Sequence, residues 1–267
     1  MTPRNFGRIA AQNAKQVVVQ RIREAERGMV FEKFSSREND IVTGIIQRME
    51  NKNVYIDLGK AEAILTPNEQ IPGEIYQYHD RMKTYIVEVK KTSKGPQIMV
   101  SRTHPGLLKR LFELEVPEIH DGLVEIKSVA REPGMRSKIS VYTKDENIDP
   151  VGACVGHKGM RVQTIVNELR GEKIDIVKYS SEPDQYVANA LSPAKVVSTE
   201  VLEEEKICRV IVPDYQLSLA IGKEGQNARL AAKLTGWKID IKSESQAAEE
   251  AEQGAQEVGV AYEADED

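Results

Sequence analysis

Two short runs decide the fold: Gly156-His157-Lys158-Gly159 and Gly222-Lys223-Glu224-Gly225. Each is followed by the tetrapeptide Lys-Ile-Asp-Ile, at residues 173–176 and 238–241. The copies lie 65 to 66 residues apart, a spacing that indicates a tandem module. Because glycine lacks a Cβ atom, such a loop can turn sharply and approach a polyanion. The helix expected after each loop would point its free N–H groups and positive dipole end at that anion.

The composition suits two or three modest domains, since the chain has 267 residues, of which 40% are hydrophobic and 30% are charged. The net charge is −5, but residues 243–267 hold nine acidic residues and no basic one. Without them, the chain has 37 basic residues and 33 acidic ones, a net charge of +4.

Cys154 and Cys208 lie in apolar strings, which indicates that they are reduced residues of the core. With no signal segment and no long apolar run, we expect a cytoplasmic protein without a membrane partner.

The first hundred residues predict a helix followed by a barrel. Apolar residues recur at helical spacing from Arg4 to Arg27, and Gly28 is expected to end this helix. Its apolar stripe must pack on the next domain or on a partner. Short segments in which apolar and polar residues alternate then indicate five strands between Asp40 and Arg102. Five strands are the number that a Greek-key barrel of the OB-fold type requires.

The remainder predicts the order α-β-β-α-α-β twice, with each glycine loop between consecutive helices. Asp149 and Asp214 are expected to cap the helices that precede the loops. The first unit is expected to contain helix 105–115, strands 123–131 and 138–143, a short helix from Pro150, a helix after the loop, and strand 173–178. The second is expected to contain helix 183–191, strands 195–201 and 207–212, helices 215–221 and 226–234, and strand 237–242. The acidic tail is expected to be disordered, either as a solvated end or as a mimic of RNA.

These features resemble a known bacterial family. Two α-β-β-α-α-β units with Gly-x-x-Gly loops look like KH domains of the bacterial type (type II), and the barrel resembles an S1 domain. Residues 6–12, 151–163 and 219–231 are similar to corresponding strings of the NusA family of transcription elongation and termination factors. The resemblance implies RNA polymerase and other Nus factors as partners. It also implies an N-terminal polymerase-binding domain ahead of the first helix, which we expect to be lacking because only Met1-Thr2 stands there.

The expected fold is therefore multidomain α+β. The expected parts are an amphipathic linker helix (1–35), an S1-like OB-fold β-barrel (36–103), a first KH domain (104–188), a second KH domain (189–243) and a disordered acidic tail (244–267).

RNA contact is expected at both loops. The glycines would admit the RNA backbone, Lys158 and Lys223 would supply charge, and His157 would donate to phosphate. Because Glu224 opposes phosphate, the second loop would depend more on its backbone amides. Arg161 and Arg229 would reach phosphate or stack on a base. The expected RNA-binding set is Gly156, His157, Lys158, Gly159, Arg161, Gly222, Lys223, Glu224, Gly225, Gln226, Asn227, Arg229 and, by resemblance to S1 domains, Tyr55.

Each of these interpretations has a simpler alternative. A Gly-x-x-Gly loop can be a plain turn between helices, and Tyr55 can be an ordinary sheet tyrosine. A phosphate-binding P-loop needs a hydroxyl residue after its lysine, but Gly159 follows Lys158. No nucleophile stands beside a base at recognisable spacing, and the histidines lack metal-ligand spacing.

The sequence thus predicts a monomeric, non-catalytic factor without cofactor or metal. It would bind single-stranded nascent RNA and modulate polymerase pausing, termination and antitermination. The alternatives are a protein-interaction scaffold on polymerase or ribosome, and an S1/KH module in RNA decay or ribosome maturation.

Overall fold

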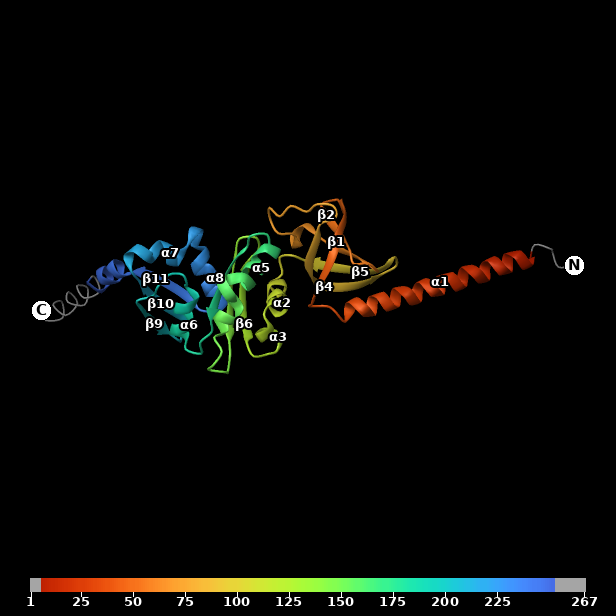
Figure 1. The fold of residues 1–267 in the computed structure, drawn as a ribbon. Helices are drawn as coiled ribbons and strands as arrows, with labels where there is room; N and C mark the ends of the chain where they lie inside the picture. Colours follow the sequence, from red (N-terminus) through yellow and green to blue (C-terminus); the bar gives the residue numbers. More distant parts are fainter. Residues whose placement is uncertain (1–5, 253–267) are drawn as a thin grey trace. The chain divides into compact units, whose positions relative to one another are not determined.

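The structure, a computed structural model, describes residues 6–252. The chain divides into two compact units with the boundary between Arg110 and Leu111. The first unit holds a long helix and a barrel, and the second holds two repeats of one α+β motif (Figure 1).

The first unit contains the five-stranded closed barrel that the sequence predicts. Its strands pair in the order β1-β2-β3-β5-β4, with β3 and β5 parallel and the other neighbours antiparallel. Alternate side chains such as Val54 and Ile56 are buried in its core. A 3-10 turn (Pro67–Glu69) follows β3. The strands are β1 (Ile41–Glu50), β2 (Asn53–Asp57), β3 (Glu62–Leu65), β4 (Arg81–Thr92) and β5 (Gly95–Ser101).

Helix α1 runs from Phe6 to Ser35, so the expectation that Gly28 ends it is wrong. Gly28 costs the helix about 1 kcal/mol relative to alanine. Contacts with the barrel outweigh that cost, because Phe34 is buried in the barrel core and Phe31 packs beside it. The ammonium of Lys91 lies 4.4 Å from the centre of the Phe31 ring. The predicted apolar stripe is therefore exposed from residue 7 to residue 27, and only the turns after Gly28 pack on the barrel.

The first repeat contains, in chain order, α2 (Pro105–Glu115), α3 (Pro117–His120), β6 (Glu125–Glu132), β7 (Arg136–Tyr142), α4 (Pro150–Val155), α5 (Met160–Glu168) and β8 (Lys173–Lys178). Its sheet has the order β6-β7-β8, antiparallel and then parallel. The Asp149 carboxylate accepts from the N–H of Val151 at 3.1 Å, and Pro150 occupies the first turn, so the predicted cap is confirmed.

The second repeat contains α6 (Pro183–Ala190), β9 (Ser198–Leu202), β10 (Ile207–Val212), α7 (Leu217–Ile221), α8 (Gln226–Thr235) and β11 (Lys238–Ser243). Its sheet, β11-β10-β9, repeats the pairing of the first. The expected capping role of Asp214 is wrong. A 3-10 turn (Asp214–Gln216) precedes α7, and the Asp214 carboxylate accepts instead from the N–H and the hydroxyl of Ser245.

The two repeats share one core. Helix α8 packs against β6 and β7 of the first repeat (Figure 1). Ala130 of β6 and Val177 of β8 belong to the same cluster of buried side chains as Val187, Leu230 and Leu234 of the second repeat. The repeats are therefore held against each other by apolar burial, which favours a fixed relation between their loops.

A buried ion pair fixes the β6–β7 hairpin. The Arg131 guanidinium donates to both carboxylate oxygens of Glu172 at 2.8 and 2.9 Å, and both side chains are fully buried. The hydroxyl of Ser137 and the N–H of Gly134 also donate to that carboxylate. Burial alone would raise the pKa of Glu172, but the hydrogen bond and charge of Arg131 outweigh it and hold the pKa below its usual range.

The prediction that the tail is disordered from residue 244 is wrong for its first part, because residues 244–252 are helical. A capping box explains this start. The N–H of Gln246 donates to the Ser243 hydroxyl, and the Ser243 N–H donates to the Gln246 side chain at 3.1 Å. Lys242 also forms an ion pair with Glu250. The remaining tail, residues 253–267, lies outside the described residues.

Candidate nucleic-acid interface

The two glycine loops follow the same backbone path. In the first, Gly156, Lys158 and Gly159 have φ values of 75°, 51° and 76°. The corresponding φ values in the second loop, at Gly222, Glu224 and Gly225, are 79°, 53° and 74°. Three positive φ values in four residues are what glycine permits and other residues resist. The sequence duplication is therefore also a duplication of local geometry.

The first glycine of each loop has a second, steric role. A Cβ atom on Gly156 would lie 2.7 Å from Cγ of Arg161, and one on Gly222 would lie 2.8 Å from both Cβ and the backbone nitrogen of Asn227. At Gly225 a Cβ would meet nothing within 4 Å, so only its positive φ favours glycine there. The first glycine thus lets the chain pass close to the following helix.

Each loop presents exposed polar side chains beside a helix N-terminus. His157, Lys158, Lys223 and Glu224 are exposed at the loop tips. Helices α5 and α8 begin directly after the second glycine, and no side chain caps either of them. The backbone N–H groups of these first turns are a site where an anion such as phosphate can bind. The arrangement therefore suits contact with a nucleic-acid backbone twice over.

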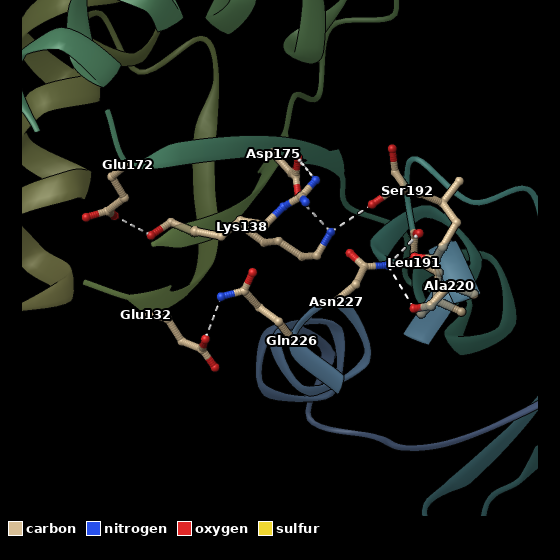
Figure 2. A network of polar contacts seen from close by, with 12 residues as sticks. Glu132, Lys138, Glu172, Asp175, Leu191, Ser192, Ala220, Gln226 and Asn227 are labelled. Atoms are coloured by element: carbon tan, nitrogen blue, oxygen red, sulfur yellow. Dashed lines mark hydrogen bonds and ion pairs between the residues drawn. The ribbon is translucent and has the colours of Figure 1, made fainter. Parts of the chain in front are cut away.

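Arg161 and Asn227 occupy equivalent positions, five residues after the first glycine of their loops. The Arg161 guanidinium donates to the carbonyl of Ala153 at 2.6 Å and to the Glu118 carboxylate at 2.9 Å. Asn227 is buried, and its amide donates to the carbonyls of Ala220 and Leu191 at 2.9 and 3.0 Å (Figure 2). Both side chains brace the turn before the loop. The structure contradicts the prediction that Asn227 contacts RNA, because its side chain does not reach the surface.

Gln226 and Arg229 are held by a carboxylate from the other repeat. Glu132, the last residue of β6, accepts from Arg229 Nε at 2.6 Å and from Gln226 Nε2 at 2.8 Å (Figure 2 shows the second contact). The hydrogen bond from Arg229 lowers the pKa of Glu132 despite its partial burial. Arg229 also donates to the Glu224 carbonyl at 3.1 Å. The sequence reasoning missed Glu132, because it lies more than 90 residues away along the chain and no local motif marks it.

Tyr55 lies on the outer face of its strand. Its neighbours Val54 and Ile56 are buried in the barrel, whereas Tyr55 is only partly buried on the opposite face. The Arg48 guanidinium lies 4.0 Å from the centre of its ring and also pairs with Glu62 at 2.8 Å. An aromatic ring beside a cation is a suitable platform for a base, so base stacking by Tyr55 stays a prediction.

Other kinds of site have little support. Among residues 6–252 there is no group of three or more His, Cys, Asp or Glu residues placed to hold a metal ion. Cys154 and Cys208 are unpaired and buried, and burial raises the pKa of both thiols. No helix within the described part of the chain is long and apolar enough to cross a membrane.

Family comparisons agree with this architecture. The model of the S1 RNA binding domain matches residues 35–101. Those of the NusA-like first and second KH domains match residues 102–179 and 183–249. The model of the NusA N-terminal domain matches residues 1–28, which corrects the expectation that this domain is lacking, since the first helix itself carries part of its sequence.

Curated relatives match at high identity over most of the chain. The transcription termination/antitermination proteins NusA of Halalkalibacterium halodurans and Bacillus subtilis are each 71% identical to it over 249 residues. These matches cover 93% of this chain, and 65% and 67% of the two relatives. NusA of Mycobacterium tuberculosis is 51% identical over 253 residues, which cover 91% of this chain and 73% of the relative. This chain therefore belongs to the NusA family.

Proposed function

We propose that the protein is a non-catalytic factor that binds nascent single-stranded RNA and modulates pausing, termination and antitermination by RNA polymerase. The observation that carries the proposal is the duplicated loop, with φ values that agree within 4°, exposed polar tips and an uncapped helix start in both copies. The names of the relatives support the transcriptional context. In this role the protein acts in the cytoplasm as a monomer, with polymerase and other Nus factors as partners.

The proposed mechanism adds several weak contacts. Each loop would take a short stretch of RNA backbone on its N–H groups and lysine, and Tyr55 would stack a base in the barrel. Because linked sites raise one another's effective concentration, modest contacts can give useful affinity without new contacts. Binding by phosphate contact should weaken steeply as salt increases.

The test is a fluorescence anisotropy titration of a labelled single-stranded RNA at several salt concentrations. The loop variant is Lys158→Asp/Lys223→Asp, which places an acid on each loop tip. Its matched control is Lys109→Asp/Lys144→Asp, which makes the same change in net charge at exposed positions outside the loops. Circular dichroism would show whether each variant is folded.

We expect the loop variant to lose roughly tenfold or more in affinity and to show a shallower salt dependence by about two phosphate contacts. The control should lose little. Equal losses in both proteins would indicate a general effect of net charge and would contradict the proposal that the loops bind RNA.

A second function, protein docking, is favoured by one observation. The part of α1 that lies before the barrel contacts exposes a row of apolar side chains, with Ile9, Val17, Val18 and Ile22 each more than half exposed. An unpaired apolar stripe on a helix commonly marks a contact with another protein. A pull-down of polymerase subunits with RNase-treated protein would test it, since binding that persists without RNA supports docking and binding that disappears does not.

A further inference from the structure

The seam between the repeats places an acidic side chain of the first repeat within the candidate RNA site of the second. The carboxylate of Glu132 takes hydrogen bonds from Arg229 and from Gln226, which begins α8 directly after the second loop. Figure 2 shows the Glu132–Gln226 contact at the edge of this seam. The Glu132 side chain is 17% exposed and that of Arg229 is 47% exposed, so the pair lies at the surface where a ligand can reach it.

The domains cannot easily move apart to withdraw this carboxylate. The ammonium of Lys138 is fully buried and donates to Asp175 at 2.9 Å and to the carbonyl of Ser192, which follows α6 of the second repeat, at 2.8 Å (Figure 2). Ala130, two residues before Glu132, belongs to the core shared by both repeats. Glu132 therefore stays beside α8, and only rotation of side chains can release Arg229.

Phosphate and Glu132 would compete for the same donors. Both are anions that accept from a guanidinium, and a carboxylate already bonded to Arg229 neutralises it and repels an approaching phosphate. The first loop differs, because its brace Arg161 pairs with Glu118 of its own repeat and its tip carries Lys158 in place of Glu224. The two loops are thus alike in backbone and unlike in charge.

We propose that Glu132 is a positioning residue for RNA at the second loop, through which the first repeat restrains Arg229 and Gln226 and weakens phosphate contact at α8. This proposal rests on the proposed RNA-binding function. It makes the second loop the weaker of the two in the wild-type chain, and removing the restraint should strengthen RNA binding at that loop and make it more salt-sensitive.

The test compares the wild-type chain with Glu132→Gln, which keeps the shape of the side chain and removes its charge. The matched control is Glu204→Gln, the same change on the exposed β9–β10 turn. Affinity for a labelled single-stranded RNA is measured across a salt series. We expect Glu132→Gln to bind about 3- to 10-fold more tightly at low salt, with a salt slope steeper by about one contact. The Glu204→Gln protein should resemble wild type.

A double-mutant cycle separates positioning from a general loosening of the seam. If Glu132 acts mainly through Arg229, then Arg229→Gln should bind more weakly than wild type, and Glu132→Gln should have a clearly smaller effect in the Arg229→Gln background, where only Gln226 is left to be released. Loosening alone would lower the melting temperature without steepening the salt slope. In the wild-type chain, NMR should show the Nε–H signal of Arg229 shift as RNA is added, a readout that requires no variant.

Two results would overturn the inference. If Glu132→Gln behaves like Glu204→Gln while the loop variant Lys158→Asp/Lys223→Asp loses binding, RNA binds at the loops but Glu132 does not restrain it. If the loop variant also binds normally, the proposed function fails and the inference fails with it.

Discussion

The third residue of each loop has a left-handed backbone conformation, and the two loops fill this position with opposite charges. Lys158 has φ 51° and Glu224 has φ 53°, so both positions impose the same backbone strain on a non-glycine side chain. An exchange between lysine and glutamate here changes charge and little else. The pair offers a clean test of electrostatics at the loop tips.

We expect Glu224→Lys to tighten RNA binding about 3- to 10-fold at low salt, because it removes a repulsive charge and adds a phosphate contact. Lys158→Glu should weaken binding by a similar factor. Titrations at low and high salt would check both, since the differences should shrink as salt screens the charges. Unchanged affinity in both variants would show that the loop tips lie away from the RNA.

The first glycine of the second loop should tolerate substitution less well than that of the first. A Cβ on Gly222 would meet the backbone nitrogen of Asn227, which cannot move freely, whereas a Cβ on Gly156 would meet only side-chain atoms of Arg161, which can shift more readily than backbone. Both positions also have positive φ. We expect Gly222→Ala to cost about 2 to 4 kcal/mol and Gly156→Ala about 1 to 2 kcal/mol. Urea denaturation followed by circular dichroism would measure both, and the reverse order would contradict the steric argument.

At the scale of elements, α1 continues through Gly28 because its last turns are anchored on the barrel. Within residues 6–252, no atom outside the adjacent backbone of the helix lies within 4 Å of the position that a Cβ at Gly28 would occupy. Gly28→Ala should therefore stabilise the helix by about 0.5 to 1 kcal/mol, and Gly28→Pro should cost about 3 kcal/mol. Thermal unfolding of the full chain would report these shifts, and a destabilising alanine would mean that the glycine is needed for a contact.

How far the sequence could be interpreted differs from element to element. The strands of both repeats and the five barrel strands were predictable, because alternation and turn residues are local signals. The ends of helices were less so. Gly28 predicts a helix end, but the burial of Phe34 stabilises the helix beyond it. The acidic composition after residue 243 predicts disorder, but a capping box starts a helix over residues 244–252. The loops could be found from their glycines and the repeated Lys-Ile-Asp-Ile tetrapeptide, whereas the role of Glu132 depends on a contact between residues far apart in the sequence.

At the scale of the whole molecule, acid should weaken the paired repeats. The pKa of Glu172 is lowered because the hydrogen bond and charge of Arg131 outweigh burial, and that of Asp175 is lowered because Arg136 and Lys138 outweigh burial. A carboxyl with a lowered folded pKa stabilises the fold above its ordinary pKa, near 4, and this stabilisation is lost as pH falls through the lowered value. We expect unfolding free energy to fall below about pH 4.

The variant that checks this is Glu172→Gln, which removes the charge partner of the fully buried Arg131. It should cost about 3 to 5 kcal/mol at neutral pH and should flatten the acid dependence. Urea denaturation at pH values from 7 to about 3 would measure both effects. If the unfolding free energy of the variant falls with decreasing pH as steeply as that of the wild type, other carboxyl groups are responsible for the acid dependence.

The core that the two repeats share has a consequence for deletion mapping. Because Ala130 and Val177 are buried together with Val187 and Leu230, the repeats should melt in one cooperative transition rather than two. A truncation between them would strip apolar surface from both halves, and the remaining half would be prone to aggregate. Loss of activity after such a truncation would report a damaged fold and not the missing loop. The contribution of each loop to RNA binding should therefore be measured with point substitutions in the intact chain.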